Sequence, residues 1–180
     1  MATKGQEIKV GLIPSLIYTV RFEGVEDTIS KNNLRMVKIV CEILGPEVVE
    51  HAGSQYKTLG TRGTMYVMLD NKNGPDDAIG RLVEPLRKLG IYEELPDTYG
   101  ANDIAAALEN LQGCKIQMLV TSQVEYQTTS TDPKDRGDAR KAIVDPETNE
   151  PIVRRYIPQF SFDNVRKMAT SEFESGNRPF

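Results

Sequence analysis

The alternation of apolar and polar residues predicts a long β-hairpin near the start of the chain. Residues 17–25 read IYTVRFEGV, and residues 34–44 resume the same period of two after a polar turn at 27–33. Such a period is typical of strands that bury one face. The apolar faces comprise Tyr18, Val20 and Phe22 in the first strand, and Val37, Ile39, Cys41 and Ile43 in the second. We expect an antiparallel pair that ends at Gly45 and Pro46, since proline cannot donate to a ladder.

A third strand and two helices are predicted in the middle of the chain. The polar, glycine-containing segment 51–61 is predicted to be a link, and residues 64–69 then alternate as TMYVML. Apolar residues recur at helical spacing between Ile79 and Leu89, and Pro85 is expected to kink this helix or split it in two. A second helix is expected in DIAAALENLQG. The expected caps and stops are Asp76 or Asp77, Gly90, Asn102 and Gly113.

Two more β-type runs close the pattern. Residues 114–126 alternate, residues 151–157 form a shorter candidate strand, and we expect the two to pair. Between them, residues 127–150 form a long charged loop of the kind that is usually functional or disordered. Residues 166–180 carry too few apolar side chains to dock firmly, which indicates a weakly ordered tail. The pattern therefore predicts a mainly β protein with a small helical insert, built as one domain over residues 1–165.

Composition fits one globular domain. The chain has 180 residues, of which 39% are hydrophobic and 27% are charged, enough to bury a core without metals or disulfides. No apolar run approaches the roughly 18 residues that span a bilayer, and residues 1–10 lack a secretion signal, so we expect a cytoplasmic protein without a membrane partner. Cys41 and Cys114 lie in apolar runs and are expected to be buried thiols rather than a disulfide. The net charge of −4 restricts any nucleic-acid site to a local patch.

Residue types that catalysis and metal binding require are scarce in this sequence. The single histidine, His51, lies in the polar link, which leaves no histidine pair for zinc and no obvious base for a nucleophile. The glycine loop 60–63 lacks the lysine of a phosphate-binding loop. Residues 70–74 resemble the start of a calcium loop, but Lys72 puts a cation where a ligand oxygen belongs. We therefore expect a binding protein without cofactor or metal, and not an enzyme.

One face of the predicted sheet combines cations with an aromatic ring. With the apolar faces inside, Arg21 and Lys38 lie on the opposite face of the hairpin, and Arg62 and Tyr66 lie on that side of the third strand. This mixture suits single-stranded nucleic acid, because cations follow the phosphates while a ring stacks on a base. The same face also carries Glu23 and Glu42. Because these carboxylates repel phosphate, a solvated face with scattered charges is the alternative interpretation.

A second candidate surface follows the long loop. Its basic and aromatic residues are Arg136, Arg140, Lys141, Arg154, Arg155 and Tyr156. Such a segment can close a groove over a bound strand. A charged hairpin arm with no ligand is the alternative interpretation.

Four pieces of the sequence carry a family resemblance that spans residues 10–165. They are LIPSLIYTVRFEGVEDTISKNNLRMVKIVCEILGP, GTMYVML, a helical insert ending LRKLGI, and LQGCKIQMLVTSQVEY. In order and spacing they resemble the phage-encoded single-stranded DNA-binding proteins with an OB-like fold. The resemblance implies a five-stranded, partly open antiparallel barrel with one or two helices between strands three and four. It also implies binding through strands two and three, which points to Arg21, Lys38, Arg62 and Tyr66.

The last two residues, Pro179 and Phe180, resemble the end of bacterial single-strand-binding proteins. Those proteins finish an acidic tail with Pro-Phe, which docks partner proteins. Here Glu172 and Glu174 supply the acidity, while Arg178 beside the dipeptide departs from that pattern. The resemblance implies contact with replication or recombination proteins, and a chance match is the alternative.

The leading hypothesis is a protein that coats single-stranded DNA without base specificity, in phage DNA replication or recombination within the host cytoplasm. The first alternative is a phage structural or host-interaction protein that docks protein partners through its sheet face or long loop. A hydrolase whose paired carboxylates lie far apart in sequence is a third. The sequence leaves open the oligomeric state, a homo-oligomer included, and the choice between DNA and RNA.

Overall fold

The computed structural model describes residues 7–129, 137 and 141–166, and over these residues the chain is mainly β. Its largest unit is an antiparallel sheet with the strand order β6-β3-β2-β7-β8, to which the short β9 adds beside β7. The strands of this sheet are β2 (Leu16–Ile29), β3 (Arg35–Gly45), β6 (Arg62–Met68), β7 (Lys115–Tyr126), β8 (Val153–Gln159) and β9 (Val165–Arg166). The predicted hairpin, the third strand and the pairing of the last two long strands are confirmed.

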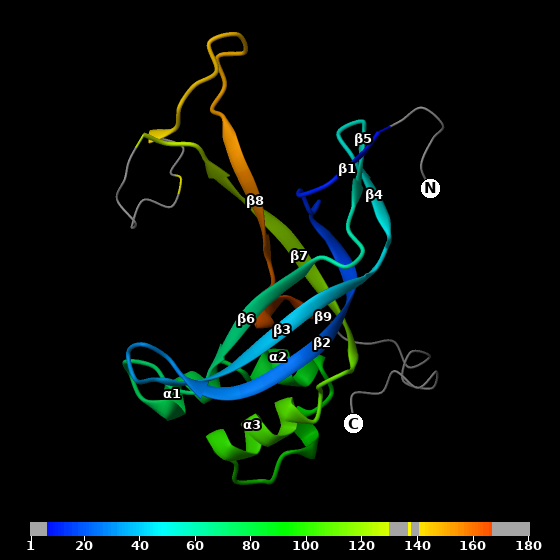
Figure 1. Cartoon of the computed structure of the whole chain (residues 1–180). Helices are drawn as coiled ribbons and strands as arrows, with labels where there is room; N and C mark the ends of the chain where they lie inside the picture. Colours follow the sequence, from blue (N-terminus) through cyan, green and yellow to red (C-terminus); the bar gives the residue numbers. More distant parts are fainter. Residues whose placement is uncertain (1–6, 130–136, 138–140, 167–180) are drawn as a thin grey trace.

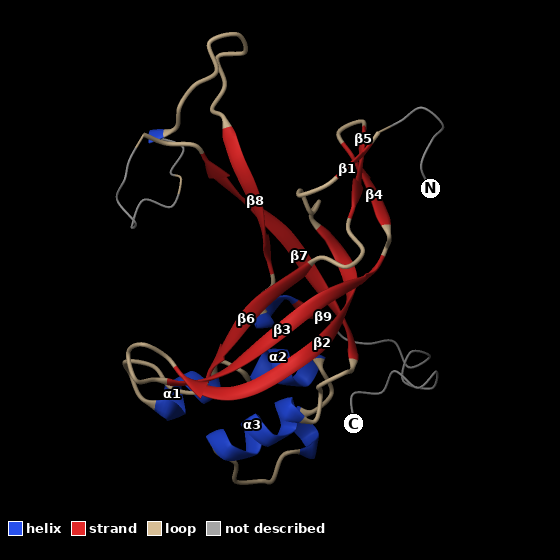
Figure 2. Ribbon diagram, in the orientation of Figure 1, coloured by secondary structure: helices blue, strands red, loops and turns tan. Residues whose placement is uncertain are grey.

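A small helical insert follows β6 and leads into β7. It comprises α1 (Pro75–Gly80), α2 (Val83–Lys88), the 3-10 turn η1 (Tyr92–Glu94) and α3 (Ala101–Glu109). Figure 2 shows these helices grouped at one end of the sheet, where their apolar residues cover its inner face. Among the described residues, no helix has the length and apolar character needed to cross a membrane.

The insert has three α-helices where one or two were expected. The first expected helix is interrupted at Arg81 and Leu82, four and three residues before Pro85. A proline ring clashes with the carbonyl four residues earlier and offers no amide to it, so the break falls there. Pro85 itself lies in the first turn of α2, where the missing amide costs nothing. The predicted aspartate caps were wrong, because Gly74 precedes Pro75 at the start of α1.

Asn102 does not cap α3, which begins one residue before it. Gly100 is the N-cap, and its amide donates to the Asp103 carboxylate at 2.9 Å. Asn102 instead accepts a hydrogen bond of 2.6 Å from Arg35, whose guanidinium also binds both oxygens of Asp27. The residue predicted to start the helix therefore ties α3 to the β2–β3 hairpin.

The sheet curls without closing into a barrel. Its edge strands in the described chain are β6 and β8, and no hydrogen-bonded ladder joins them. Side-chain packing replaces the ladder, because Phe160, directly after β8, lies against Gly63 of β6. A Cβ placed on Gly63 would lie 2.5 Å from two ring atoms of Phe160. Glycine is therefore required here by the close approach of the ring.

A second, three-stranded sheet includes part of the segment 51–61 that was predicted to be a polar link. β4 (Val48–His51) and β5 (Ser54–Lys57) form an antiparallel hairpin, and β1 (Ile8–Lys9) pairs parallel to β5. Positive φ angles at Ala52 (51°) and Gly53 (78°) make the two-residue turn. The prediction missed these strands because they are short and their side chains show little apolar alternation.

The strands β7 and β8 continue past the rest of the sheet as a projecting ribbon (Figure 1). We name the ribbon of residues 122–129 and 141–158 the arm. Part of the predicted loop 127–150 folds back on it, since Gln127 exchanges backbone hydrogen bonds with Ile143 and Ile152. Residues 130–136, 138–140 and 167–180, which include most of the predicted tail, lie outside the described chain.

Candidate functional site

Strand register brings the four residues predicted on the sheet to one exposed face. Arg21 of β2 pairs with Glu42 of β3, which pairs with Arg62 of β6. Lys38 pairs with Tyr66, four residues along β3 from Glu42 and therefore on the same side. We name this side of β2, β3 and β6 the outer face. Sequence alternation was sufficient to predict the outer face. Inner residues such as Ile39 and Val20 are completely buried, so the residues that alternate with them point outward.

The outer face includes a further cation that the sequence reasoning did not select. Lys115 of β7 pairs with Arg21 and extends the charged row to Lys115–Arg21–Glu42–Arg62. Lys115 precedes buried Ile116, so alternation places the Lys115 side chain on the exposed side of β7. Only the pairing of β2 with β7, however, brings it beside Arg21. That pairing links residues almost a hundred positions apart, which local patterns do not reveal.

Acidic residues divide the cationic row. Glu23 accepts a hydrogen bond of 3.1 Å from Arg62. A hydrogen bond with Glu42, followed by burial, raises the pKa of Glu23 above its ordinary value, although the charge of Arg62 lowers it. Glu23 is the extra residue at a β-bulge between the Phe22 and Gly24 pairs, which turns its side chain toward this row. The row therefore carries only a small net positive charge.

Toward the helical insert the outer face changes from charged to apolar. Tyr66 is 52% exposed, and Met36 pairs with Met68 in the next row beyond it. An exposed ring and two thioethers form a flat surface that suits stacking against another aromatic system. Arg62 lies at the start of β6 and Met68 at its end. Cations and stacking groups thus follow one another along a single strand.

The arm holds a second cationic group, built on one buried carboxylate. Glu125 is 7% exposed, and it binds Arg154 and Arg155, whose side chains are 51% and 65% exposed. Adjacent strand residues normally point to opposite faces, but a register shift beside Glu125 lets both arginines reach it. Burial raises the pKa of Glu125, but hydrogen bonds from Arg155 and Arg154 outweigh burial and hold it below its ordinary value. The cluster carries one net positive charge.

Backbone from the long loop covers Glu125 on one side. The amide of Tyr126 donates to the carbonyl of Gly137 at 3.1 Å. A Cβ on Gly137 would lie 2.6 Å from the Glu125 Cγ, so only glycine permits this approach. Glu125 was not predicted, because its burial depends on a loop residue and a bulge that leave no periodic signal.

The other residues predicted on the arm do not all join this cluster. Tyr156 pairs with Val124, whereas Arg155 pairs with Glu125, so the ring lies on the opposite face from the arginines. Lys141 is exposed at the start of the returning segment. The remaining predicted residues, Arg136, Arg140, Pro179 and Phe180, lie outside the described residues. The proposed second surface is therefore described only in part, and its aromatic member faces away.

The base of the arm adjoins the cationic end of the outer face. Phe160 packs on Gly63, the neighbour of Arg62, and β8 leads from there to Arg155. Five residues of strand correspond to about 17 Å. Alternation along β7 also puts Glu125 on the same side as Lys115. The two cationic groups are thus connected along one side of the sheet.

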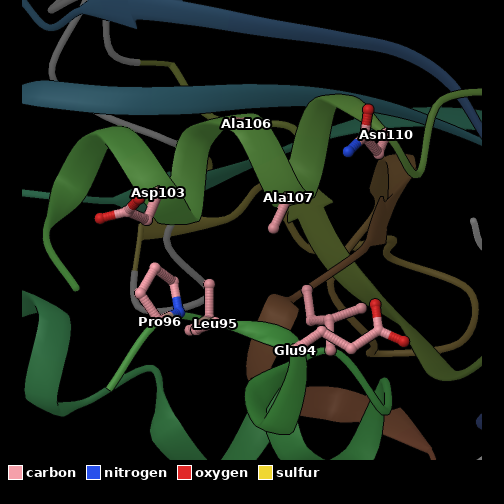
Figure 3. Close-up of a pocket in the computed structure, with 8 residues that line it drawn as sticks. Glu94, Leu95, Pro96, Asp103, Ala106, Ala107 and Asn110 are labelled. Atoms are coloured by element: carbon pink, nitrogen blue, oxygen red, sulfur yellow. The ribbon is translucent and has the colours of Figure 1, made fainter. Parts of the chain in front are cut away.

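A hollow of about 220 Å³ lies between α3 and the segment 94–96, away from both groups (Figure 3). Ala106 and Ala107 form one wall and Leu95 and Pro96 the other. The charged groups on its rim are Glu94 and Asp103. Because both are acidic, this hollow does not suit a phosphate.

The described residues offer little for metal or nucleophilic chemistry. They contain no group of three or more histidine, cysteine or acidic side chains arranged to hold a metal ion. In the segment 70–74, which resembles the start of a calcium loop, the side-chain oxygens of Asp70 and Asn71 each accept a hydrogen bond of 2.8 Å from a backbone amide of their own turn. Cys41 and Cys114 are not joined by a disulfide, and burial raises the pKa of Cys41 to about 12.

No protein-family model matches the chain, and no curated protein gives a significant sequence match. The interpretation of the site therefore depends on its geometry and charge.

Proposed function

We propose that the chain binds single-stranded DNA along the outer face, chiefly through phosphate contacts and base stacking. The observation that carries this proposal is the position of Tyr66 on the same exposed face as Arg21, Lys38 and Arg62. Cations along one side of a sheet neutralise phosphates, and an exposed ring stacks on any base. Binding of this kind needs no cofactor and little base recognition.

We further propose that the fold is OB-like. In support, β2 pairs with both β3 and β7, and the helical insert separates β6 from β7. The edges β6 and β8 approach each other through Phe160 and Gly63, as expected of a partly open five-stranded barrel. Such barrels bind oligonucleotides on the face of their second and third strands, which correspond here to β3 and β6. The outer face lies on these strands.

The low net charge of the outer face sets the expected strength of binding. Its cations are Arg21, Lys38, Arg62 and Lys115, and its glutamates are Glu23, Glu26 and Glu42. With four phosphate contacts, the logarithm of affinity should fall with the logarithm of salt concentration with a slope of about −3. If Lys141, Arg154 and Arg155 also bind phosphates, the slope should approach about −5. Stacking is the part of the affinity that salt leaves unchanged.

The experiment is fluorescence anisotropy of a labelled single-stranded oligonucleotide and its duplex, measured from about 50 mM to about 200 mM salt. We expect tighter binding of the single strand, because the bases of a duplex are not free to stack on Tyr66. Absence of binding at the lowest salt, or equal binding of duplex and single strand, would contradict the proposal.

Docking of a protein partner by the arm is a second candidate function. Ile143, Val144 and Val153 are 38%, 47% and 37% exposed near the end of the arm. Clustered exposed apolar residues mark interaction surfaces in many proteins. Concentration-dependent assembly in static light scattering, abolished by Val144→Ser and without oligonucleotide affinity, would favour this function over DNA binding.

A further inference from the structure

A second hollow opens beside Tyr66, at the free edge of β6. Its volume is about 170 Å³, below the roughly 300–1,000 Å³ of pockets that enclose a drug-sized ligand. The residues that line it belong to β6, the helical insert and the turn η3 (Phe162–Asn164). We name it the β6-edge hollow. Its size suits one flat ring system rather than a whole nucleotide.

The walls of the β6-edge hollow combine apolar and polar residues. Tyr66 and Met68 lie on the side of the outer face, and buried Leu82 and Phe162 contribute from the insert and η3. Tyr66 belongs to both surfaces, so a strand that stacks on it passes the mouth of the hollow. The apolar part of this lining suits the face of an aromatic ring.

Two polar residues that line the hollow, Asn71 and Arg81, each donate one hydrogen bond to Asp77 outside it. Asp77 accepts a hydrogen bond of 2.8 Å from Asn71 and one of 3.0 Å from Arg81. Ser161 and Asp163 also line the hollow, and in the described part of the chain their side chains have no hydrogen-bond partner. A hydroxyl donates or accepts, and a carboxylate only accepts. Ser161 and Asp163 together can therefore pair with the edge of a ring that carries an amino group beside an unprotonated ring nitrogen.

We propose that the β6-edge hollow holds one unstacked base of the bound DNA and prefers cytosine and adenine, whose exocyclic amino group lies beside an unprotonated ring nitrogen. The amino group donates to Asp163, and Ser161 donates to the adjacent ring nitrogen. Cytosine and adenine present this donor and acceptor side by side. Thymine presents carbonyl oxygens on both sides of its single N–H, and these oxygens face the carboxylate unfavourably. This inference rests on the proposed function, and it adds a preference for composition to general single-strand binding.

The test compares the binding of dC12 and dT12 by anisotropy at about pH 8, where the two pyrimidines differ chiefly in their edges. One hydrogen bond corresponds to a preference of about two- to tenfold. We expect the wild-type protein to prefer dC12 by this factor and Asp163→Asn to bind both equally. Asp97→Asn is the matched control, since Asp97 is exposed outside the hollow and its loss of charge should leave the ratio unchanged.

A filling variant tests the space itself. Ser161→Leu should remove the preference for dC12 while leaving the binding of dT12 within about twofold. Ser15→Leu makes the same change at an exposed site before β2 and should leave the preference intact. Circular dichroism of each variant checks that it is folded.

The outcomes separate this inference from the proposed function. Equal affinity of the wild-type protein for dC12 and dT12, or a preference that survives both Asp163→Asn and Ser161→Leu, overturns the base preference while DNA binding stands. Failure of every single strand to bind overturns the proposed function and the inference with it.

Discussion

On their inner side, β2, β3 and β6 bury a layer of apolar side chains over most of their length; on their outer side, the same strands carry cations, acids, two methionines and one exposed tyrosine. Ile39 is completely buried, whereas its neighbour Lys38 pairs with exposed Tyr66. Packing dictates the inner residues, because any polar atom there loses its water. Packing makes no such demand on the outer residues. Their arrangement therefore carries information about binding, and changes on the two faces should have separable effects.

The largest expected effect is on the inner face. Ile39→Ala should lower the free energy of unfolding by about 2–5 kcal/mol, because it leaves a cavity among buried side chains. Lys38→Ala, one residue away on the outer face, should change it by less than about 0.5 kcal/mol. Urea denaturation followed by circular dichroism measures both. Similar losses for the two variants would remove the distinction between the faces.

Gly63 tests how the two edges of the sheet are held together. Gly63→Ala should cost about 1–3 kcal/mol of stability, since the new Cβ would lie 2.5 Å from the Phe160 ring and force it to move. Gly24→Ala is the matched control, because a Cβ there meets Val40 at an ordinary 4.0 Å. Thermal unfolding of both variants provides the comparison. A harmless Gly63→Ala would show that Phe160 does not need this approach.

On the outer face, a change of Tyr66 should affect DNA binding rather than stability. Tyr66→Ala should weaken binding of single-stranded DNA by about 1–3 kcal/mol through loss of stacking, with stability nearly unchanged. Tyr66→Phe keeps the ring and should bind like the wild type. Anisotropy and thermal unfolding measure the two properties. Equal affinity of the Tyr66→Ala variant would exclude stacking at this position.

The arm tests whether the second cationic group extends the first. The double change Arg154→Gln with Arg155→Gln should reduce the salt-dependence slope of DNA binding by about 1.4 if both arginines bind phosphates. Lys57→Gln, an exposed change in the small sheet, should leave the slope unaltered. An unchanged slope in the double variant would confine DNA to the outer face.

The smallest effect concerns the acids of the outer face. Because the pKa of Glu23 is raised, this group takes up its proton early as the pH falls, and the face becomes more positive. DNA affinity should therefore rise as the pH is lowered from about 7.5 toward the pKa of Glu23. The raised pKa also means that its contribution to stability is present at low pH and is lost as the pH rises through it. Glu23→Gln should remove this part of the pH dependence, measured by anisotropy; an unchanged profile would contradict the role of Glu23.

Alternation was sufficient to predict the two faces, since inside and outside follow directly from a period of two. It predicted buried Tyr18 and Val37 and placed Lys38 and Tyr66 together outside. It did not predict the β4–β5 hairpin, whose four-residue strands carry little apolar pattern. Strand existence was thus predictable where one face is fully buried, and not where burial is partial.

The parts of the site that escaped prediction depend on irregular or distant pairings. A bulge beside Glu125 brings Arg154 and Arg155 to one carboxylate and leaves Tyr156 on the other face. The β6-edge hollow joins Tyr66 to Ser161, almost a hundred residues later in the chain. Neither a register shift nor a contact of that sequence separation has a local signature, so both required the three-dimensional structure.

Methionine methyl groups offer the most direct measurement of the central claim, that DNA binds the outer face. Met36 and Met68 lie on that face, whereas Met65 and Met118 are buried on the inner side. In a protein labelled with 13C at its methionine methyls, titration with a single-stranded oligonucleotide should shift the Met36 and Met68 signals and leave those of Met65 and Met118 nearly unmoved. Saturable binding that leaves Met36 and Met68 unshifted would contradict the claim and move the site elsewhere.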